Sequence, residues 1–277
     1  MNFGRAKTIL IILFAIVNLF LIGYIFVTSD DITTPNSKTI SDTVKILNER
    51  NVFLDKSVKI TKSDNINYLN LNGITTDERV LASKLLGEYT KKNNKYVGDF
   101  GDLEIKNGEF IWNVKDNHTI KNFDQKNVTR YVFSFLKDHQ IDTSDLKAES
   151  AELVDGNYKV VCHHYFFDKE LFNVSTEVYV SGGGVYQVKG RIFTLDSLSQ
   201  SETQANNPIN VLLNYSANKN KEEKAEIIAI NAGYCTENDP KEYKSLSAQP
   251  CFELVFKSGE RLYFDAFSAK LIKQAQN

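Results

Sequence analysis

An uncharged apolar run near the start of the chain constrains its architecture more than any other feature. From Thr8 to Val27, the sequence TILIILFAIVNLFLIGYIFV runs for 20 residues without a charge. At about 1.5 Å of rise per residue, a helix of this length spans the roughly 30 Å hydrocarbon core of a bilayer. The run therefore predicts a transmembrane helix over residues 8–27. A signal peptide has an apolar stretch of only about 7–15 residues, so we expect the helix to stay as an anchor rather than be cleaved.

The charges on either side of the run predict its orientation. Arg5 and Lys7 precede it, whereas Asp30 and Asp31 follow it. Basic residues are retained on the cytoplasmic side of a membrane, so we expect residues 1–7 to be cytoplasmic. Everything after the anchor is then expected outside the cell. The sequence thus predicts a single-pass protein of the cell membrane with an extracellular C-terminal domain.

The charge balance argues against a nucleic-acid partner. The chain has a formal net charge of −2, and Arg5 and Lys7 are the only charges before Asp30, so the outer part is more acidic still. Nucleic-acid binding requires a concentrated basic face. We therefore expect no nucleic-acid partner.

One polar residue lies in the middle of the predicted anchor. Asn18 falls on the same helical stripe as Ile11, Ala15, Ile22 and Ile25. An amide at that depth has no water to bond, and a second helix would satisfy it well. The stripe therefore predicts a contact with the helix of a membrane partner. The alternative is a tolerated Asn that bonds its own backbone or faces lipid, because interhelical bonds average only about 0.6 kcal/mol.

The rest of the chain predicts an α+β fold behind a short linker. Residues 28–40 are polar and contain Pro35, as linkers do. We expect one extracytoplasmic domain over residues 41–122 and a second over residues 123–277, the latter built from two units of a helix and a meander. A first helix is predicted over Ser41–Arg50 with Ser41 as its cap, and a second after the capping-box pattern Thr75-Thr76-Asp77-Glu78, with Leu81, Leu85 and Tyr89 on one face. A third is predicted from the apolar stripe Val128, Tyr131, Val132, Phe135 and Leu136. A fourth should begin with Asn207 as cap and Pro208 in its first turn, and should bury Val211, Leu212 and Tyr215.

The strands are predicted from alternation and turn residues. A meander should run from Ala151 to Thr194. A closing hairpin, CFELVFKSGERLYFDAFSAKLI, should turn at Ser258-Gly259. Helices followed by antiparallel strands recur along the chain, which is typical of the α+β class. Reversals of the meander are expected near Asp155-Gly156, Asp168-Lys169 and Gly182-Gly183-Gly184.

No arrangement of residues predicts catalysis. His163 and His164 are adjacent on a predicted strand, so their side chains should point to opposite faces and should not serve one site. The glycine run at residues 182–184 lacks the following helix with Lys and Ser or Thr that a phosphate loop requires. Trp112 and the run Tyr165-Phe166-Phe167 favour core positions over a ligand groove. We therefore expect no enzyme, no cofactor and no metal site.

Three cysteines, Cys162, Cys235 and Cys251, fit no metal-binding spacing. One interpretation is that all three are small apolar core residues. The other is a disulfide between Cys235 and Cys251, which the environment outside the cytoplasm permits.

Two stretches resemble known families. The opening MNFGRAKTILIILFAIVNLFLIGYIF is similar to that of the YycI (WalI) family, in which a Lys-Thr pair precedes an aliphatic anchor with an Asn-Leu-Phe-Leu step. Here the pair is Lys7-Thr8 and the step is Asn18-Leu19-Phe20-Leu21. The closing FELVFKSGERLYFDAFSAKLI resembles the last hairpin of PepSY-like units. Family membership would imply PepSY-like units outside the membrane.

The YycI resemblance also implies a function. Members of that family are auxiliary proteins of the YycFG (WalRK) two-component system in low-GC Gram-positive bacteria. The resemblance implies contacts with a sensor histidine kinase of YycG type and a sister protein of YycH type, and control of cell-wall metabolism. A non-enzymatic regulator is therefore expected. The rival expectation is an anchored extracellular PepSY-like module that binds a ligand or inhibits a peptidase.

Overall fold

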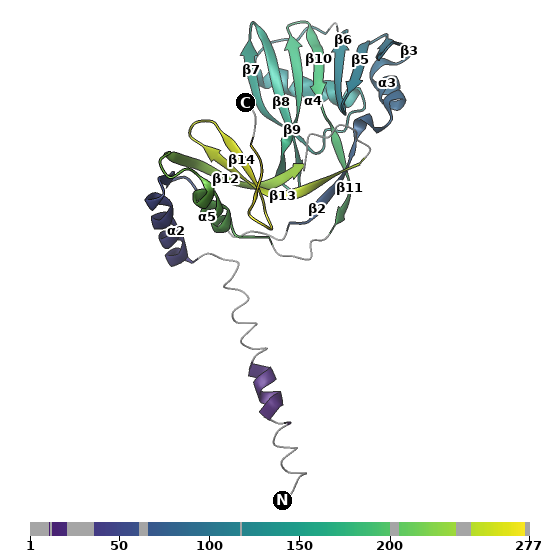
Figure 1. The fold of residues 1–277 in the computed structure, drawn as a ribbon. Coiled ribbons are helices and arrows are strands. Elements are labelled where there is room, and N and C mark those ends of the chain that lie inside the picture. Colours follow the sequence, from purple (N-terminus) through teal and green to yellow (C-terminus); the bar gives the residue numbers. More distant parts are fainter. Residues whose placement is uncertain are drawn as a thin grey trace, which may run out of the picture.

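Antiparallel strands dominate the folded body of the chain (Figure 1). The computed structural model describes residues 11, 13–20, 36–60, 66–116, 118–199, 205–236 and 245–274. Its mixture of sheet and a few helices confirms the predicted α+β class. The elements are α2 (Ser37–Glu49), β1 (Val52–Leu54), β2 (Tyr68–Gly73), the short 3-10 helix η1 (Ile74–Thr76), α3 (Glu78–Leu86), β3 (Tyr89–Lys92), β4 (Lys95–Gly98), β5 (Gly101–Lys106), β6 (Glu109–Val114), α4 (Gln125–Asp138), β7 (Leu146–Val154), β8 (Asn157–Phe166), β9 (Lys169–Ser181), β10 (Gly184–Gly190), β11 (Phe193–Ser199), α5 (Pro208–Asn218), β12 (Ala225–Thr236), β13 (Ser245–Phe256), β14 (Arg261–Asp265) and β15 (Leu271–Gln274).

One group of strands forms an upper sheet that carries α3 and α4 (Figure 1). Its antiparallel order is β3-β4-β5-β6-β10-β9-β8-β7. The core between the sheet and the two helices includes Trp112 and Phe110, both fully buried. Trp112 lies opposite Val188, which in turn lies opposite Val178, so the apolar residues of three strands share one face.

A second group of strands forms a lower sheet next to α2 and α5 (Figure 1). Here β12 pairs with β13, and β13 pairs with both β2 and β14. At the edges, β11 pairs with β2, β15 pairs with β14, and β1 runs parallel to β12. Leu47 of α2 and Leu212 of α5 are fully buried in the core of this part, with Phe252 and Phe264.

Strand β9 joins the two sheets. Its first half meets β12, where Leu171 lies opposite Tyr234, and its second half pairs with β8 and β10. The domain boundary expected between residues 122 and 123 falls inside the upper sheet, since β6 before it pairs with β10 after it. Hydrophobic residues from both sides of that boundary share one core.

Helix α4 forms where its apolar stripe predicted it. The Asp124 side chain accepts a hydrogen bond from the Asn127 backbone N–H, which satisfies one of the free donors at the helix start. Val128, Val132 and Leu136 are fully buried against the sheet. Both the helix and its packing on a sheet are confirmed.

Two other helices form in the predicted regions but begin or end at other residues than predicted. Helix α3 begins after Asp77, whose side chain caps it, and ends at Gly87, where the backbone takes φ 71°. The placement of Tyr89 on that helix was therefore wrong: a left-handed glycine ends helices, and Tyr89 starts β3. Helix α2 begins at Ser37 rather than Ser41, because Asn36 provides the capping oxygen for the Thr39 N–H at 2.8 Å.

The predicted reversals of the meander are confirmed. Asp155 and Gly156 take φ 51° and 79° at the β7–β8 turn, as hairpin turns of this length require. Asp168 lies in the β8–β9 turn, and the glycines at 182–183 lie between β9 and β10. Helix α5 begins at Pro208 after the Asn207 cap, and the closing hairpin turns between Phe256 and Arg261, both as predicted.

Candidate functional site

A cluster of charged side chains lies where the upper sheet meets the closing hairpin of the lower sheet. Its members come from five strands in two separate stretches of the sequence, residues 149–170 and 253–261, and we call it the His163 cluster. A β-bulge in β7, between Ala148 and Ser150, redirects the side chain at position 149. The cluster consists of Glu149 (β7), His163 and Tyr165 (β8), Glu170 (β9), Glu253 (β13) and Arg261 (β14).

Ion pairs link these residues in a chain. The His163 ring lies between two carboxylates, with Nδ1 2.5 Å from Glu170 Oε1 and Nε2 2.9 Å from Glu149 Oε2. Arg261 Nη2 lies 3.6 Å from Glu149 Oε1, and Arg261 Nη1 donates to Glu253 Oε1 at 3.1 Å. Glu149 therefore connects the upper sheet to the lower one.

The most deeply buried charge of the cluster accepts a hydrogen bond at each of its two oxygens. Glu253 is 1% exposed. Its Oε1 accepts from Arg261, and its Oε2 accepts from Asn231 Nδ2 at 2.9 Å. A buried charge is tolerated when it is paired and hydrogen-bonded. Removing Arg261 would leave this carboxylate without its cation.

Burial and charge oppose each other at His163 and Glu170. Burial lowers the pKa of His163, but the hydrogen bond and charge of Glu170 and the charge of Glu149 outweigh it, so this pKa lies above the usual 6.5. Burial raises the pKa of Glu170, but the hydrogen bond and charge of His163, the hydrogen bond from Tyr165 and the charge of Arg261 together outweigh it, so this pKa lies below the usual 4.5. The arrangement favours an imidazolium between carboxylates.

His164 faces the opposite side of β8, as strand alternation predicted. It is 1% exposed, and its ring stacks on Phe166 in the core. The Phe193 backbone N–H donates to His164 Nε2 at 3.2 Å. Burial lowers the pKa of His164 to about 4, so it is neutral at pH 7. The two histidines therefore do not share a site.

The residues of the His163 cluster do not form a metal centre. Among the described residues, no group of three or more His, Cys, Asp and Glu side chains is placed to hold a metal ion. The ring nitrogens of His163 both face carboxylates. Trp112 and Phe166 lie in the core as predicted, but the core position expected for Phe167 was wrong, because this residue lies in the β8–β9 turn and is 60% exposed.

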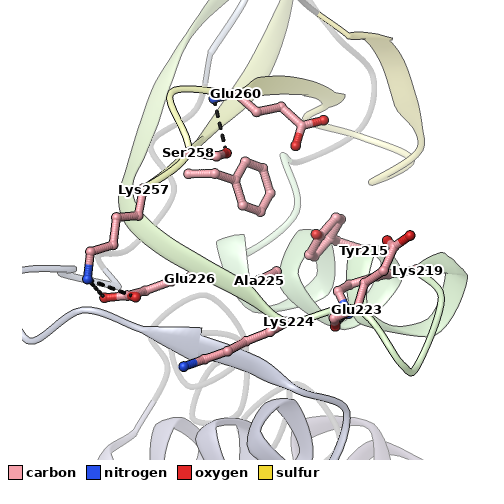
Figure 2. A pocket seen from close by; sticks show the side chains of 10 residues that line it. Tyr215, Lys219, Glu223, Lys224, Ala225, Glu226, Lys257, Ser258 and Glu260 are labelled. Atoms are coloured by element: carbon pink, nitrogen blue, oxygen red, sulfur yellow. Dashed lines mark hydrogen bonds and ion pairs between the residues drawn. The ribbon is translucent and has the colours of Figure 1, made fainter.

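An open hollow, which no pattern in the sequence predicted, lies at the turn of the closing hairpin (Figure 2). It measures about 330 Å³ and lies between the end of α5, the start of β12 and the β13–β14 turn. Its lining carries charges of both signs and the aromatic side chains of Tyr215 and Phe256, and Lys257 pairs with Glu226 at 2.8 Å. The lining residues are Tyr215, Lys219, Glu223, Lys224, Ala225, Glu226, Phe256, Lys257, Ser258 and Glu260.

The residues expected to contact a membrane partner are partly described. Residues 13–20 are helical, and their side chains are exposed. Ile11, Ala15 and Asn18 are in the described part. Asn18 Nδ2 donates to the Phe14 carbonyl at 2.8 Å, which is the bond to its own backbone that the alternative interpretation expected. Ile22, Ile25 and most of the predicted transmembrane helix 8–27 lie outside the described residues. Within those residues, no helix has both the length and the apolar character needed to cross a bilayer.

Comparisons with known proteins do not assign a family. No family model matches the sequence, and no curated protein matches it. An uncharacterized protein from Eubacterium rectale has a TM-score of 0.47 and 8% identity, and the match covers 82% of this chain and 91% of that one. The Bacillus megaterium YpeB C-terminal domain has a TM-score of 0.37 and 12% identity, over 72% of this chain and 96% of that one. At these scores, neither likeness carries an argument about function.

Proposed function

We propose that this chain is a membrane-anchored, non-enzymatic regulator of a sensor histidine kinase that controls cell-wall metabolism. It acts by protein–protein contacts of its transmembrane helix and of its outer domain, which we propose to consist of PepSY-like units. The YycI-like opening, with Lys7-Thr8 and the step Asn18-Leu19-Phe20-Leu21, motivates the choice of partner. A sister protein of YycH type is the second proposed partner.

The observation that carries the proposal is the apolar helix before the folded body. Large side chains along it are exposed, including Phe14 at 71% and Phe20 at 75%. Such a concentration of exposed apolar surface marks a membrane or protein contact. The flanking Arg5 and Lys7 support an orientation with the folded body outside the cell.

The Asn18 side chain bonds its own helix, as the alternative interpretation expected, but it keeps polar groups for a contact inside the membrane. Its bond to the Phe14 carbonyl uses one amide N–H, and an Asn side chain has a second N–H and a carbonyl oxygen. The remaining groups are available to a helix of the kinase. One such interhelical hydrogen bond contributes about 0.6 kcal/mol on average. The apolar stripe around Asn18 must therefore supply the rest of the binding free energy between the helices.

The test separates an active helix from a passive tether. A membrane peptide of residues 1–29 alone should alter the output of the kinase, measured as transcription of a wall-hydrolase gene under its control. Replacing residues 8–27 with an unrelated apolar helix at equal membrane level should abolish the effect. Asn18→Leu should weaken it modestly, whereas Phe20→Leu on the opposite side of the helix should not. Full activity of the unrelated helix would overturn the proposal.

The hollow of Figure 2 favours a second candidate function. It is lined by the turn of the hairpin that resembles PepSY-like units, with Lys219 and Lys224 on its wall. An anchored module that binds a peptide or inhibits a peptidase would use this surface. In that case, a full-length variant with Lys219→Glu and Lys224→Glu should lose peptidase inhibition. Under the regulator proposal, the same variant keeps the effect of the anchor on the kinase.

A further inference from the structure

Two of the three cysteines meet on neighbouring strands. Cys235 lies opposite Gln249 in the β12–β13 ladder, and Cys251 lies opposite Gly233. The two positions are diagonal neighbours, and their side chains share one face because side chains alternate along a strand. Gly233 has no side chain, and the ring of Phe172 occupies the space where a Cβ would be.

The sulfur atoms are closer than unbonded atoms of their size. Cys251 Sγ lies 2.7 Å from Cys235 Sγ. Even two unbonded carbon atoms stay about 3.5–4.0 Å apart, and sulfur is larger, whereas a disulfide bond measures about 2.05 Å. The side chains are 2% and 0% exposed, with the rings of Phe172 and Tyr263 packed around them. The protein therefore holds the two thiols in contact in a closed pocket.

We propose that Cys235 and Cys251 form a disulfide in the mature protein. Each thiol gives up one proton and one electron, and an oxidant of the disulfide class accepts both electrons. A Cys thiolate attacks one sulfur of that oxidant, which breaks its S–S bond, releases the other sulfur as a thiol and leaves a mixed disulfide. The second Cys thiolate then attacks the protein sulfur of the mixed disulfide and releases the remaining sulfur of the oxidant as a thiol. Because both sulfurs are buried after folding, the exchange takes place before the β12–β13 hairpin closes.

The bond would strengthen the junction between the two sheets. Cys235 follows Tyr234, the residue of β12 that lies opposite Leu171 of β9. A cross-link from Cys235 to Cys251 fixes the register of β12 against β13 at that point. It also restricts the unfolded chain, which is how disulfides stabilise proteins in the chain-entropy account.

Cys162 provides an internal control. It is fully buried in the core of the upper sheet, apart from the other two cysteines. Burial raises the pKa of its thiol to about 12, which makes it unreactive in the folded state. In the denatured protein, it should remain a free thiol.

The test counts free thiols in the full chain. The detergent-solubilised protein, folded in a buffer with oxidised and reduced glutathione, is denatured without reductant, alkylated with iodoacetamide and weighed. One alkyl group is expected, at Cys162, and three after reduction. The Cys235→Ser variant should carry two without reduction. Three alkyl groups in the unreduced wild type, or a cross-link that includes Cys162, would overturn the proposal.

A stability measurement supplies a second readout. Reductant should lower the unfolding midpoint of the wild type and leave that of a Cys235→Ala/Cys251→Ala variant unchanged. An equal response of both proteins would count against the disulfide. Both experiments are independent of the kinase, so they can fail or succeed separately from the proposed function.

Discussion

At the scale of residues, His163 and His164 show how one strand places neighbouring histidines in opposite environments. The ring of His163 lies between Glu149 and Glu170, which favour the proton. The ring of His164 lies against Phe166 in the core, where burial disfavours the proton. The cluster therefore gains stability from a charge on one ring, while the core requires the other ring to be neutral.

The stability that His163 contributes should depend on pH in a defined window. Its folded pKa is raised, so the contribution is complete below the unfolded pKa of 6.5 and is lost as the pH rises through the folded pKa. The folded pKa of Glu170 is lowered, so its contribution is complete above 4.5 and is lost as the pH falls through the folded pKa. The ion pair between His163 and Glu170 should therefore contribute most to stability between pH 4.5 and pH 6.5.

A double-mutant cycle tests this window. The coupling between His163→Gln and Glu170→Gln, measured by urea unfolding, should be about 0.5–3 kcal/mol near pH 5.5. It should decline towards pH 9, where His163 becomes neutral. The titration of His164 is common to all four proteins and cancels in the cycle. A coupling energy that does not change with pH would contradict the assignment.

Arg261 and Lys257 allow a matched comparison on one hairpin. Arg261→Met removes the cation beside Glu253, which is 1% exposed, and should destabilise the protein by about 3 kcal/mol. Lys257→Met breaks the exposed pair with Glu226 and should change stability by about 0–1 kcal/mol. Chemical denaturation at neutral pH measures both. Equal effects would mean that the buried pair contributes no more than a surface pair.

At the scale of elements, the helices were predictable because their signals are local. The stripe of α4 and the Asn207-Pro208 start of α5 each fall within a few residues, and both helices form there. At the end of α3, the apolar Tyr89 indicates that the helix continues, whereas Gly87 indicates that it stops. The helix stops at Gly87 because this glycine takes a left-handed conformation.

The His163 cluster could not be predicted from the sequence. Strand alternation separated the two histidines correctly, but nothing in the sequence near His163 indicates Arg261 or Glu253. These residues meet only because β7–β9 of one sheet lie beside β13–β14 of the other. The bulge that redirects Glu149 is likewise a property of strand register rather than of local sequence.

The packing of α4 on the upper sheet gives a prediction at this scale. Leu136 is fully buried, so Leu136→Ala should reduce the free energy of unfolding by about 2–5 kcal/mol, from lost burial and the cavity left behind. Lys126→Ala, at an exposed position of the same helix, should change it by less than about 0.5 kcal/mol. Similar values for the two variants would contradict the assigned face of the helix.

At the scale of the whole molecule, β9 connects the two sheets and the His163 cluster lies beside the connection. Leu171 of β9 lies opposite Tyr234, and Glu170 precedes it in the same strand. The core at the junction adds Leu69, Leu71 and Phe193. Apolar contacts and ion pairs thus both stabilise the boundary between the two sheets. Substitutions in the His163 cluster should therefore weaken the packing of one sheet against the other as well as local stability.

The proposed topology is tested with a reporter that is active only outside the cytoplasm. Fused after Asn277, it should be active, and the fusion should remain in the membrane fraction, because residues 8–27 are proposed as an uncleaved anchor. Fusion of the same reporter to a chain lacking residues 8–27 serves as the control and should be inactive. Release of the active full-length fusion into the medium would indicate a cleaved signal peptide instead.

Site-specific cross-linking from the proposed anchor tests the central claim most directly. A photoreactive residue replaces Ala15, on the Asn18 stripe, or Phe20, on the opposite side of the helix, in otherwise identical full-length chains in the bacterial membrane. The regulator proposal predicts a cross-link to the sensor kinase from position 15 and none from position 20, since a helix presents one face to its partner. Equal cross-linking from both positions, or none from position 15, would contradict a specific contact between the anchor and the kinase.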